Sequence, residues 1–372
     1  MDVSVVLGLL LYVVGGLSGS AIYLPLKGVR HWAWESYWMI YALVGLVVFP
    51  WTIAFWTTPA LLHVLHATPG RILFWCYLFG VMWGIGGLTF GITVRYLGVG
   101  LGFPLVCGII AAVGTLVPPI YNGQFASLSG MSSGIIMLCG VAVAMIGIVA
   151  IGMAGMAKER ELSEDQKKVA VAEFNFLRGL VMAMFCGVTS AGMFLGIRAG
   201  EAMETVAADI QAIDPASPWV GLPKMVVILA GGFTVNFAYC LFLNIKNGSV
   251  GDYARNQAPL LRNYLFSAAA GILWYGQFTF LTMGDTQTGL LKCFSASVLM
   301  SSMILFSTVW GVLLREWRGT GSHTRRLLVS GLVLLLASLV ITGYANIVEH
   351  RVPETAVTGS SPSVAPKFHS GK

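Results

Sequence analysis

Three ionisable side chains stand at the edges of, or inside, long apolar stretches of this sequence: Glu35, Asp285 and Lys292. A carboxylate among apolar groups keeps its proton to a higher pH than one in water, so it can exchange a proton near neutral pH. Glu35, beside Trp32 and Trp34, is either such a proton carrier or a carboxylate that stabilises the start of a helix. Asp285 is either a second carrier or the cap of a helix that begins there. Lys292 follows Asp285 by two helical turns and lies on the same helix face. A charged side chain within the depth of the bilayer has either a binding role or a structural one.

The composition shows what kind of protein must position these residues. The 372 residues are 10% charged and 56% hydrophobic, with a mean hydropathy of +0.79, whereas soluble domains are about a quarter charged. The chain is therefore expected to be an all-α membrane protein that crosses the lipid bilayer several times. The net charge of +6 follows from basic loops on the cytoplasmic side, so no nucleic-acid partner is expected.

Ten continuous apolar runs are each long enough to span a bilayer, which takes about 20 helical residues. Because they do not alternate, they predict helices rather than barrel strands. The expected spans lie near 3–24, 36–57, 72–94, 98–120, 132–156, 177–197, 221–244, 264–283, 287–313 and 326–346.

Lysines and arginines are distributed unequally between the two sets of loops. The loops after odd-numbered spans carry 15 of them, and the opposite side carries 6. The basic side is expected to be cytoplasmic, which places both termini outside.

The chain also repeats weakly. Residues 16–27, GLSGSAIYLPLK, are similar to residues 187–198, GVTSAGMFLGIR, and GVMW at 80–83 is similar to GILW at 271–274. Two five-helix units in opposite orientations are expected, an arrangement typical of alternating-access transporters. The predicted parts are a first repeat at 1–157, a charged, solvated linker at 158–175, a second repeat at 176–347 and a disordered tail at 348–372.

The third run is unusually rich in glycine. Gly80, Gly84, Gly87 and Gly91 follow one helix face, which predicts close packing against another helix. The alternative is a backbone lining for a substrate cavity. No strand precedes these glycines, which excludes a dinucleotide-binding loop.

Several long stretches resemble the L-rhamnose–proton symporter family of the drug/metabolite transporter superfamily. They are KGVRHWAWES (27–36), MWGIGGLTFGITVRYLG (82–98), GTLVPPIYNGQF (114–125), KER (158–160), AEFNFLRGL (172–180), CGVTSAGM (186–193), WYGQF (274–278) and REW (315–317). The resemblance implies ten helices in two inverted halves, a bacterial cytoplasmic membrane, and import of a sugar with protons. The sequence departs from the family in TGLLKCFSAS (288–297), which contains Lys292 and Cys293 where enteric members carry an acidic residue early in the ninth helix. It departs again at Gly87, where those members have an asparagine.

Aromatic and amide side chains in the runs are candidates for sugar binding. The C–H face of a sugar can pack on an aromatic ring, and the sugar hydroxyls can form hydrogen bonds with amide and hydroxyl side chains. The residues expected to bind the substrate are Trp83, Arg95, Asn236, Trp274, Tyr275, Gln277 and Lys292. The alternatives are helix packing and interhelical hydrogen bonding, or, for Arg95, an anchor at the membrane surface.

Other classes of function are less compatible with the sequence. The GMSSG at 130–134 fits a hydrolase pattern but follows no strand, and the chain has no nucleotide-binding loop and no clustered Cys and His. Neither enzymatic activity nor a cofactor is expected, and protons are the expected coupling ion for transport. The competing hypotheses are a transporter or exporter of another small metabolite and a membrane sensor that binds sugar without moving it.

Overall fold

Helices make up nearly all of the described chain. The computed structural model describes residues 3–121, 132–163, 173–210, 212–214, 217, 219–255, 258–288 and 295–351. The elements are α1 (Val3–Ser20), α2 (Tyr23–Leu26), α3 (Trp34–Leu43), the π-helix η1 (Val44–Val48), α4 (Phe49–Thr57), α5 (Leu61–Ala67), α6 (Gly70–Leu97), α7 (Val99–Tyr121), α9 (Ser132–Glu161), α11 (Phe176–Ala199), α12 (Glu201–Asp209), α13 (Leu222–Asn247), the 3₁₀-helix η2 (Ser249–Ala254), α14 (Leu260–Thr288), α15 (Ser295–Leu313) and α16 (Ser322–Arg351).

Helical segments overlie each of the ten apolar runs. Seven stretches among the described residues have the length and apolar composition of a membrane span, and shorter apolar stretches lie in α7 and α15. Large apolar side chains such as Leu10, Phe74 and Val340 lie exposed on the outside of the bundle, where a bilayer would cover them. The expectation of an all-α membrane protein is confirmed.

The expected start of the ninth span was wrong. The sequence placed Asp285 at that start, but α14 runs on to Thr288, so the residue lies inside the preceding helix. At Gly284 the helix packs against α1, where an added Cβ would lie 2.9 Å from the Gly8 carbonyl oxygen. This contact between helices favours continuation of α14 where its sequence turns polar.

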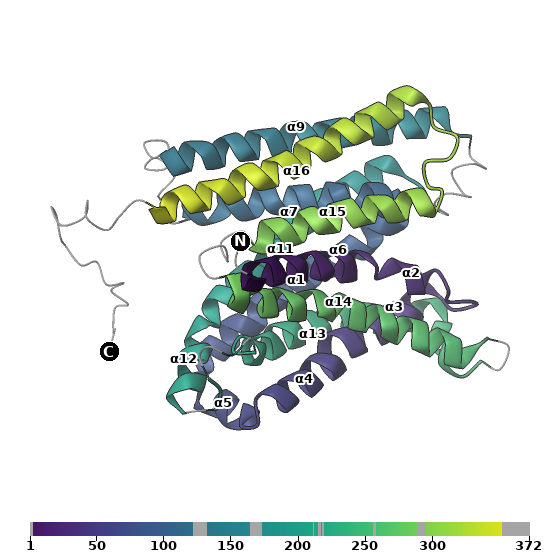
Figure 1. Cartoon of the computed structure of the whole chain (residues 1–372). Helices are drawn as coiled ribbons and strands as arrows, with labels where there is room; N and C mark the ends of the chain where they lie inside the picture. Colours follow the sequence, from purple (N-terminus) through teal and green to yellow (C-terminus); the bar gives the residue numbers. More distant parts are fainter. Residues whose placement is uncertain are drawn as a thin grey trace.

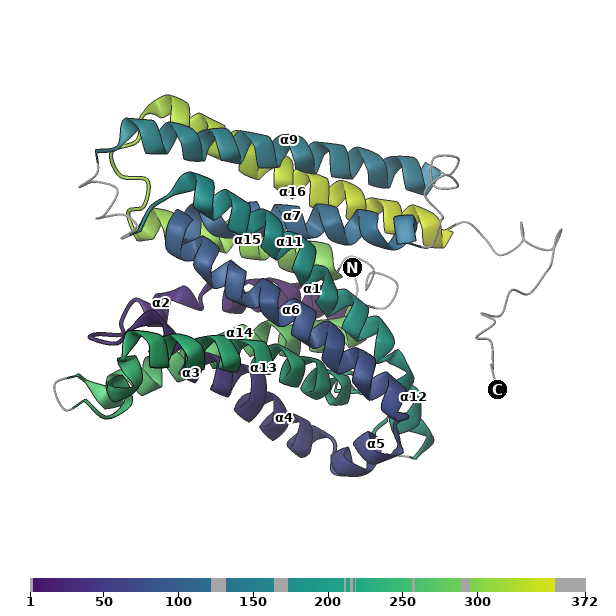
Figure 2. The ribbon, with the colours of Figure 1, turned by 180° about the vertical axis from the view of Figure 1, so that it is seen from behind.

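The helices form layers that mix distant parts of the chain (Figures 1 and 2). Helices α9 and α16 form a pair on one side, and α7 and α15 pack beneath them. In the middle, α1 packs against α14 and α6 packs against α11. The last layer contains α13, α3 and α4, with α13 also packing against α6.

The glycines of α6 lie in two different surroundings, a contact between helices and the wall of a cavity. A Cβ at Gly80 would collide with the carbonyl of Ile228, and one at Gly84 would lie 2.7 Å from the Cα of Gly232. These two positions therefore allow α6 and α13 to approach closely. Gly87, one turn further along, lies instead on the wall of an internal cavity.

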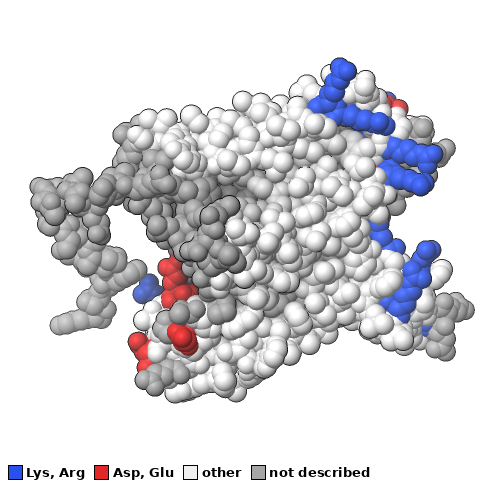
Figure 3. Space-filling view, in the orientation of Figure 1, with Lys and Arg blue, Asp and Glu red and all other residues white. Residues whose placement is uncertain are grey.

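The two ends of the bundle differ in charge. Figure 3 shows lysines and arginines gathered at one end and acidic side chains at the other. We call the first the basic end. The start of α1 and the end of α16 both lie at the opposite end (Figure 1).

The expected solvated linker begins with a buried residue. Lys158, on the last turns of α9, has an exposed fraction of only 1%. Its ammonium group lies over the rings of Phe174 and Trp317, because α9 continues past the apolar run and packs inside the basic end. The expected disordered tail was placed too early, because residues 348–351 still belong to α16. Residues 164–172 of the expected linker and 352–372 of the expected tail lie outside the described residues.

Candidate functional site

An internal cavity of about 150 Å³ lies between the two halves of the chain. Cavities of about this volume hold one six-membered ring in other proteins. Its wall is contributed by Gly19, Ile22, Trp38, Tyr41, Leu46, Trp83, Gly86, Gly87, Phe90, Phe103, Cys107, Ile110, Ser190, Met193, Ile197, Asn236, Trp274, Gln277, Phe278, Leu281, Leu299, Met300 and Met303. The wall is mainly apolar and aromatic, with a few polar groups, which is the usual make-up of a small-molecule site.

Two tryptophans from different halves meet in this wall. The ring centres of Trp83 on α6 and Trp274 on α14 are 5.2 Å apart, with 35° between the ring planes. Phe278, one turn after Trp274, adds a third ring at 5.1 Å from it. The three rings are inclined to one another, by 35° and 66°, and together they make an aromatic part of the wall. An aromatic ring in such a wall can pack against the C–H side of a sugar.

The amide of Asn236 is held in one orientation. Trp38 donates a hydrogen bond from Nε1 to Asn236 Oδ1 at 2.9 Å, and Asn236 Nδ2 donates to the carbonyl oxygen of Gly232 at 2.8 Å. An amide has two N–H groups and an oxygen with two lone pairs. These two bonds use one of each, so Asn236 retains one donor and one acceptor position for a further partner.

Gln277 forms a second polar point of the wall. Its Nε2 donates to the carbonyl oxygen of Trp274 at 2.9 Å, which fixes the side chain along its own helix. A Cβ at Gly19 would lie 2.9 Å from Gln277 Oε1, so the glycine makes room for this amide oxygen beside α1.

Two of the predicted binding residues lie away from the cavity. Tyr275 is fully buried, and its ring packs edge-on against Phe49 at 5.7 Å. Arg95 Nη2 pairs with Glu173 Oε1 at 2.7 Å, and both side chains are more than 40% exposed. The structure therefore brings together Trp83, Asn236, Trp274 and Gln277, but not Tyr275 or Arg95.

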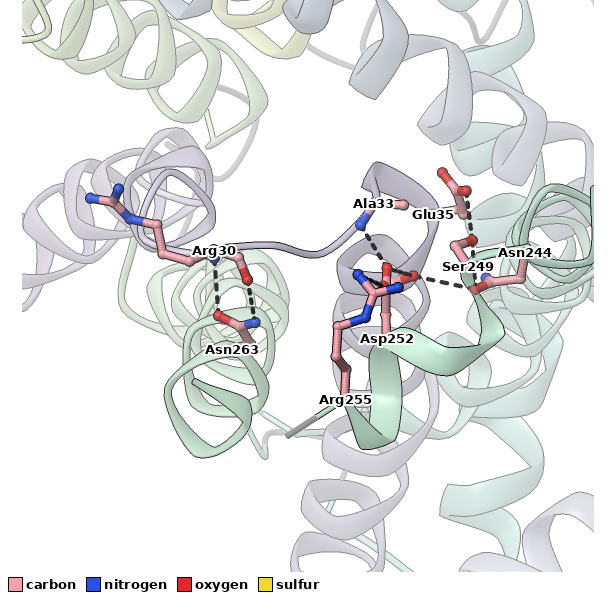
Figure 4. Close-up of polar contacts among 9 residues, drawn as sticks. Arg30, Ala33, Glu35, Asn244, Ser249, Asp252, Arg255 and Asn263 are labelled. Carbon is pink, nitrogen blue, oxygen red and sulfur yellow. Dashed lines mark hydrogen bonds and ion pairs between the residues drawn. The ribbon is translucent and has the colours of Figure 1, made fainter. Parts of the chain in front are cut away.

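Glu35 lies in the first turn of α3 and is buried, at the basic end of the bundle. Its Oε1 accepts hydrogen bonds from Asn247 Nδ2 at 2.9 Å and from Ser249 Oγ at 2.8 Å. Figure 4 shows the carboxylate pointing toward Ser249, which belongs to η2 in the other half of the chain. Burial removes the carboxylate from water, and both of these hydrogen-bond donors are neutral.

The remaining predicted residues cannot be placed in the site. The backbone of Asp285 belongs to α14, but its side chain lies outside the described residues, as does the whole of Lys292. Among the residues that the structure does describe, no three His, Cys, Asp or Glu side chains are arranged to hold a metal ion.

Sequence reasoning missed several wall residues. Trp38, Tyr41, Phe90 and Ser190 all line the cavity. Phe90 and Ser190 fall inside stretches on which the family resemblance rests, and that was the available signal. Trp38 and Tyr41 carry no such signal, because only the packing of α3 against α13 shows which face of α3 is turned inward.

Comparison with known proteins assigns the chain to a family. The family model described as L-rhamnose-proton symport protein (RhaT) matches residues 1–350. An L-rhamnose-proton symporter of Cronobacter sakazakii is 35% identical over 347 residues, which cover 92% of this chain and 98% of the relative. One from Mannheimia succiniciproducens is 36% identical over 352 residues, covering 93% and 100%, and one from Yersinia pestis is 35% identical over 346, covering 92% and 98%. No solved structure matches this chain.

The matches extend over nearly the whole chain, well beyond the quoted stretches, so the resemblance seen in the sequence is confirmed. This multi-pass membrane protein belongs to the L-rhamnose–proton symporter family, a family of transporters and not of enzymes.

Proposed function

We propose that this chain imports L-rhamnose or a related monosaccharide across the bacterial cytoplasmic membrane together with protons. The observation that carries the proposal is the cavity between the two halves, walled by the Trp83–Trp274 pair and by the amides of Asn236 and Gln277. Indole faces bind the C–H side of a sugar, and fixed amides bind its hydroxyls. The relatives that are named L-rhamnose-proton symporters support the choice of sugar.

The proposed architecture is ten membrane-spanning helices in two inverted halves. The packing of the helices supports this architecture, because it is nearly unchanged when each helix is replaced by its proposed counterpart. The proposed counterparts are α1 and α11, α6 and α14, α7 and α15, the α3–α4 segment and α13, and α9 and α16. The pair α1–α14 becomes α11–α6, the pair α1–α15 becomes α11–α7, and α13–α6 becomes the contact of α3 with α14. Trp83 and Trp274, equivalent in the repeat, contact each other, as residues beside a pseudo-two-fold axis do. This symmetry supports a site at the junction of the halves that opens to each side in turn.

The basic end is proposed to face the cytoplasm, with both termini outside. The separation of charge seen in Figure 3 supports this orientation, because loops rich in lysine and arginine are retained on the cytoplasmic side.

Glu35 is the proposed proton-coupling residue. Its burial and its hydrogen bonds from Asn247 and Ser249 place a carboxylate out of water at a junction of the two halves. Gain or loss of a proton by this carboxylate would therefore change its contacts with the second half. Asp285 is the second candidate for proton coupling, and Lys292 remains a proposed substrate-binding residue.

Uptake of labelled L-rhamnose into membrane vesicles, with and without an inward pH gradient, tests the proposal. A symporter accumulates the sugar only when the gradient is present. An exporter of another metabolite gives no uptake, and a sensor binds the sugar without accumulation in either condition.

A further inference from the structure

Two carboxylates of the second half, Asp252 and Glu316, hold the starts of two helices of the first half. Both lie at the basic end, and both are buried, with exposed fractions of 3% and 1%. The helices that they hold are α3 and α7, each of which lines the cavity. Neither carboxylate is part of the cavity wall described above, so neither Asp252 nor Glu316 is a sugar-binding residue of the proposed site.

Asp252 binds the beginning of α3. Its Oδ2 accepts a hydrogen bond from the backbone N–H of Ala33 at 2.8 Å and another from Ser36 Oγ at 2.9 Å. Figure 4 shows this carboxylate, carried by η2, directed at the first turn of α3. Nearby, Asn263 on α14 bonds both the N–H and the carbonyl of Arg30, so the segment leading into α3 is held by the second half as well.

Glu316 binds the beginning of α7. Its two oxygens accept from the backbone N–H groups of Val99 at 3.1 Å and Gly100 at 2.9 Å. These N–H groups have no partner within their own helix, because Gly98, at φ 81°, ends α6 and starts a new helix. The carboxylate therefore satisfies them and is favoured by the positive end of the helix dipole.

Several neighbouring contacts hold Glu316 beside the start of α7. Lys27, from the first half, reaches its Oε1 at 3.5 Å. A Cβ on Gly100 would lie 3.0 Å from the Cα of Gly311, so α7 and α15 touch backbone to backbone at this point. The preceding Arg315 adopts a left-handed conformation, with φ 58°, which is uncommon for a residue other than glycine. The ammonium group of Lys158 lies 4.7 Å from the ring centre of the adjacent Trp317.

The held helix starts lie close to the cavity along the chain. Phe103 in the cavity wall is one helical turn after Val99, and Trp38 is little more than one turn after Ala33. In the alternating access proposed above, opening the cavity toward the basic end would move these starts away from the second half. At the end opposite the basic end, by contrast, the ion pair between Lys224 of α13 and Glu204 of α12 joins two elements of the second half.

We propose that Asp252 and Glu316 form two latches that close the basic end of the transporter and must release before the cavity opens there. The proposal rests on the alternating access proposed above, and it does not depend on which sugar is carried. It also gives a role to Lys27, Gly98 and Glu316, which lie in sequence stretches typical of the family but away from the cavity.

The test uses Cys107, which lines the cavity and is 1% exposed, as the sole cysteine of the protein. Its rate of reaction with a small membrane-impermeant methanethiosulfonate is measured in right-side-out and inside-out vesicles. A Ser163→Cys variant identifies which vesicles present the basic end to the reagent, so an error in the proposed orientation cannot be mistaken for a failure of the latches.

Asp252→Asn and Glu316→Gln are expected to raise the reaction rate from the basic end by about ten-fold, since losing a charge-assisted hydrogen bond shifts a two-state equilibrium on that order. Gly311→Ala, which forces α7 and α15 apart without changing charge, is expected to act in the same direction. Glu161→Gln, the same chemical change at the same end away from the cavity, is expected to leave the rate unchanged.

Unchanged rates in Asp252→Asn and Glu316→Gln, with normal amounts of monodisperse protein in the membrane, would overturn the proposal. If these two variants are not present in the membrane in normal amounts, Gly311→Ala is used instead, and an unchanged reaction rate of Cys107 in that variant would overturn the proposal. Because no sugar is added, the outcome is separate from whether L-rhamnose is the substrate.

Discussion

The indole rings of Trp83 and Trp274, which come from different halves of the chain, lie 5.2 Å apart in the wall of one cavity. Trp83 ends the stretch GVMW and Trp274 ends the similar stretch GILW. In the proposed inverted repeat these two positions are equivalent, and equivalent residues that touch lie beside the axis that would relate the two halves. The same two side chains therefore belong to both the proposed symmetry and the proposed sugar site.

Replacing either tryptophan by alanine should weaken sugar binding by roughly ten-fold, because each ring supplies an aromatic contact of about 1 kcal/mol beyond its buried area. Binding of labelled sugar to purified protein measures the effect. Trp75→Ala, on the same helix and 39% exposed on its outer side, is the control and should bind normally. A well-expressed Trp83→Ala/Trp274→Ala double variant with normal uptake would contradict the site.

Trp38→Phe should raise the KM for uptake roughly five-fold with little change in maximal rate. Phenylalanine keeps the aromatic packing but removes the N–H that orients Asn236, and a net hydrogen bond is worth about 1 kcal/mol. Trp34→Phe makes the same change in the neighbouring ring, which stacks on Trp38 at 4.9 Å, and should have a smaller effect. Equal effects of the two variants would show that only ring packing matters.

Glu35→Gln should abolish accumulation of sugar driven by a pH gradient and preserve exchange of sugar across the membrane. Glutamine can still accept hydrogen bonds from Asn247 and Ser249, but it cannot take up or release a proton. Vesicle uptake with and without the gradient, together with counterflow of labelled sugar, separates the two activities. A variant that still concentrates sugar would make Glu35 a structural carboxylate, and Asp285→Asn would then be measured in the same way.

A cysteine at Ser163, exposed at the basic end, should resist an impermeant thiol reagent in intact cells and react after the cells are opened. Asp209→Cys, exposed at the end of α12 on the opposite side of the bundle (Figure 1), should react in intact cells. The reverse pattern would place the basic end outside and overturn the proposed orientation.

Glu161 should stabilise the junction of α9 and α16 only while it is ionised. Its pKa is lowered by hydrogen bonds from the Gly321 N–H and the Thr324 hydroxyl, both at 2.7 Å. A lowered folded-state pKa means that the stabilisation is present above the unfolded value of about 4.3 and is lost as the pH falls through the folded one. Glu161→Gln should therefore lower the melting temperature slightly at pH 7, and the difference should disappear on acidification. A constant difference at all pH values would exclude this explanation.

The class of protein and the positions of its helices followed from the sequence because they depend on local quantities. The thickness of the bilayer sets the length of an apolar run, whatever the rest of the chain does. The similarity of GVMW and GILW made Trp83 and Trp274 candidates before any contact between them was known. The start of the ninth span was misplaced because the end of α14 depends on packing of Gly284 against α1, which no local pattern contains.

The cavity and its polar contacts were decided by the tertiary structure. Glu35 meets Ser249 and Trp38 meets Asn236 only because α3 is packed against elements of the other half. Lys158 was expected in solvent and is buried, since α9 extends past its apolar run and carries the residue beneath Trp317. Hydrophobicity determined which segments enter the membrane, whereas the choice of which side chains face each other arose from the close packing of helices far apart in the sequence.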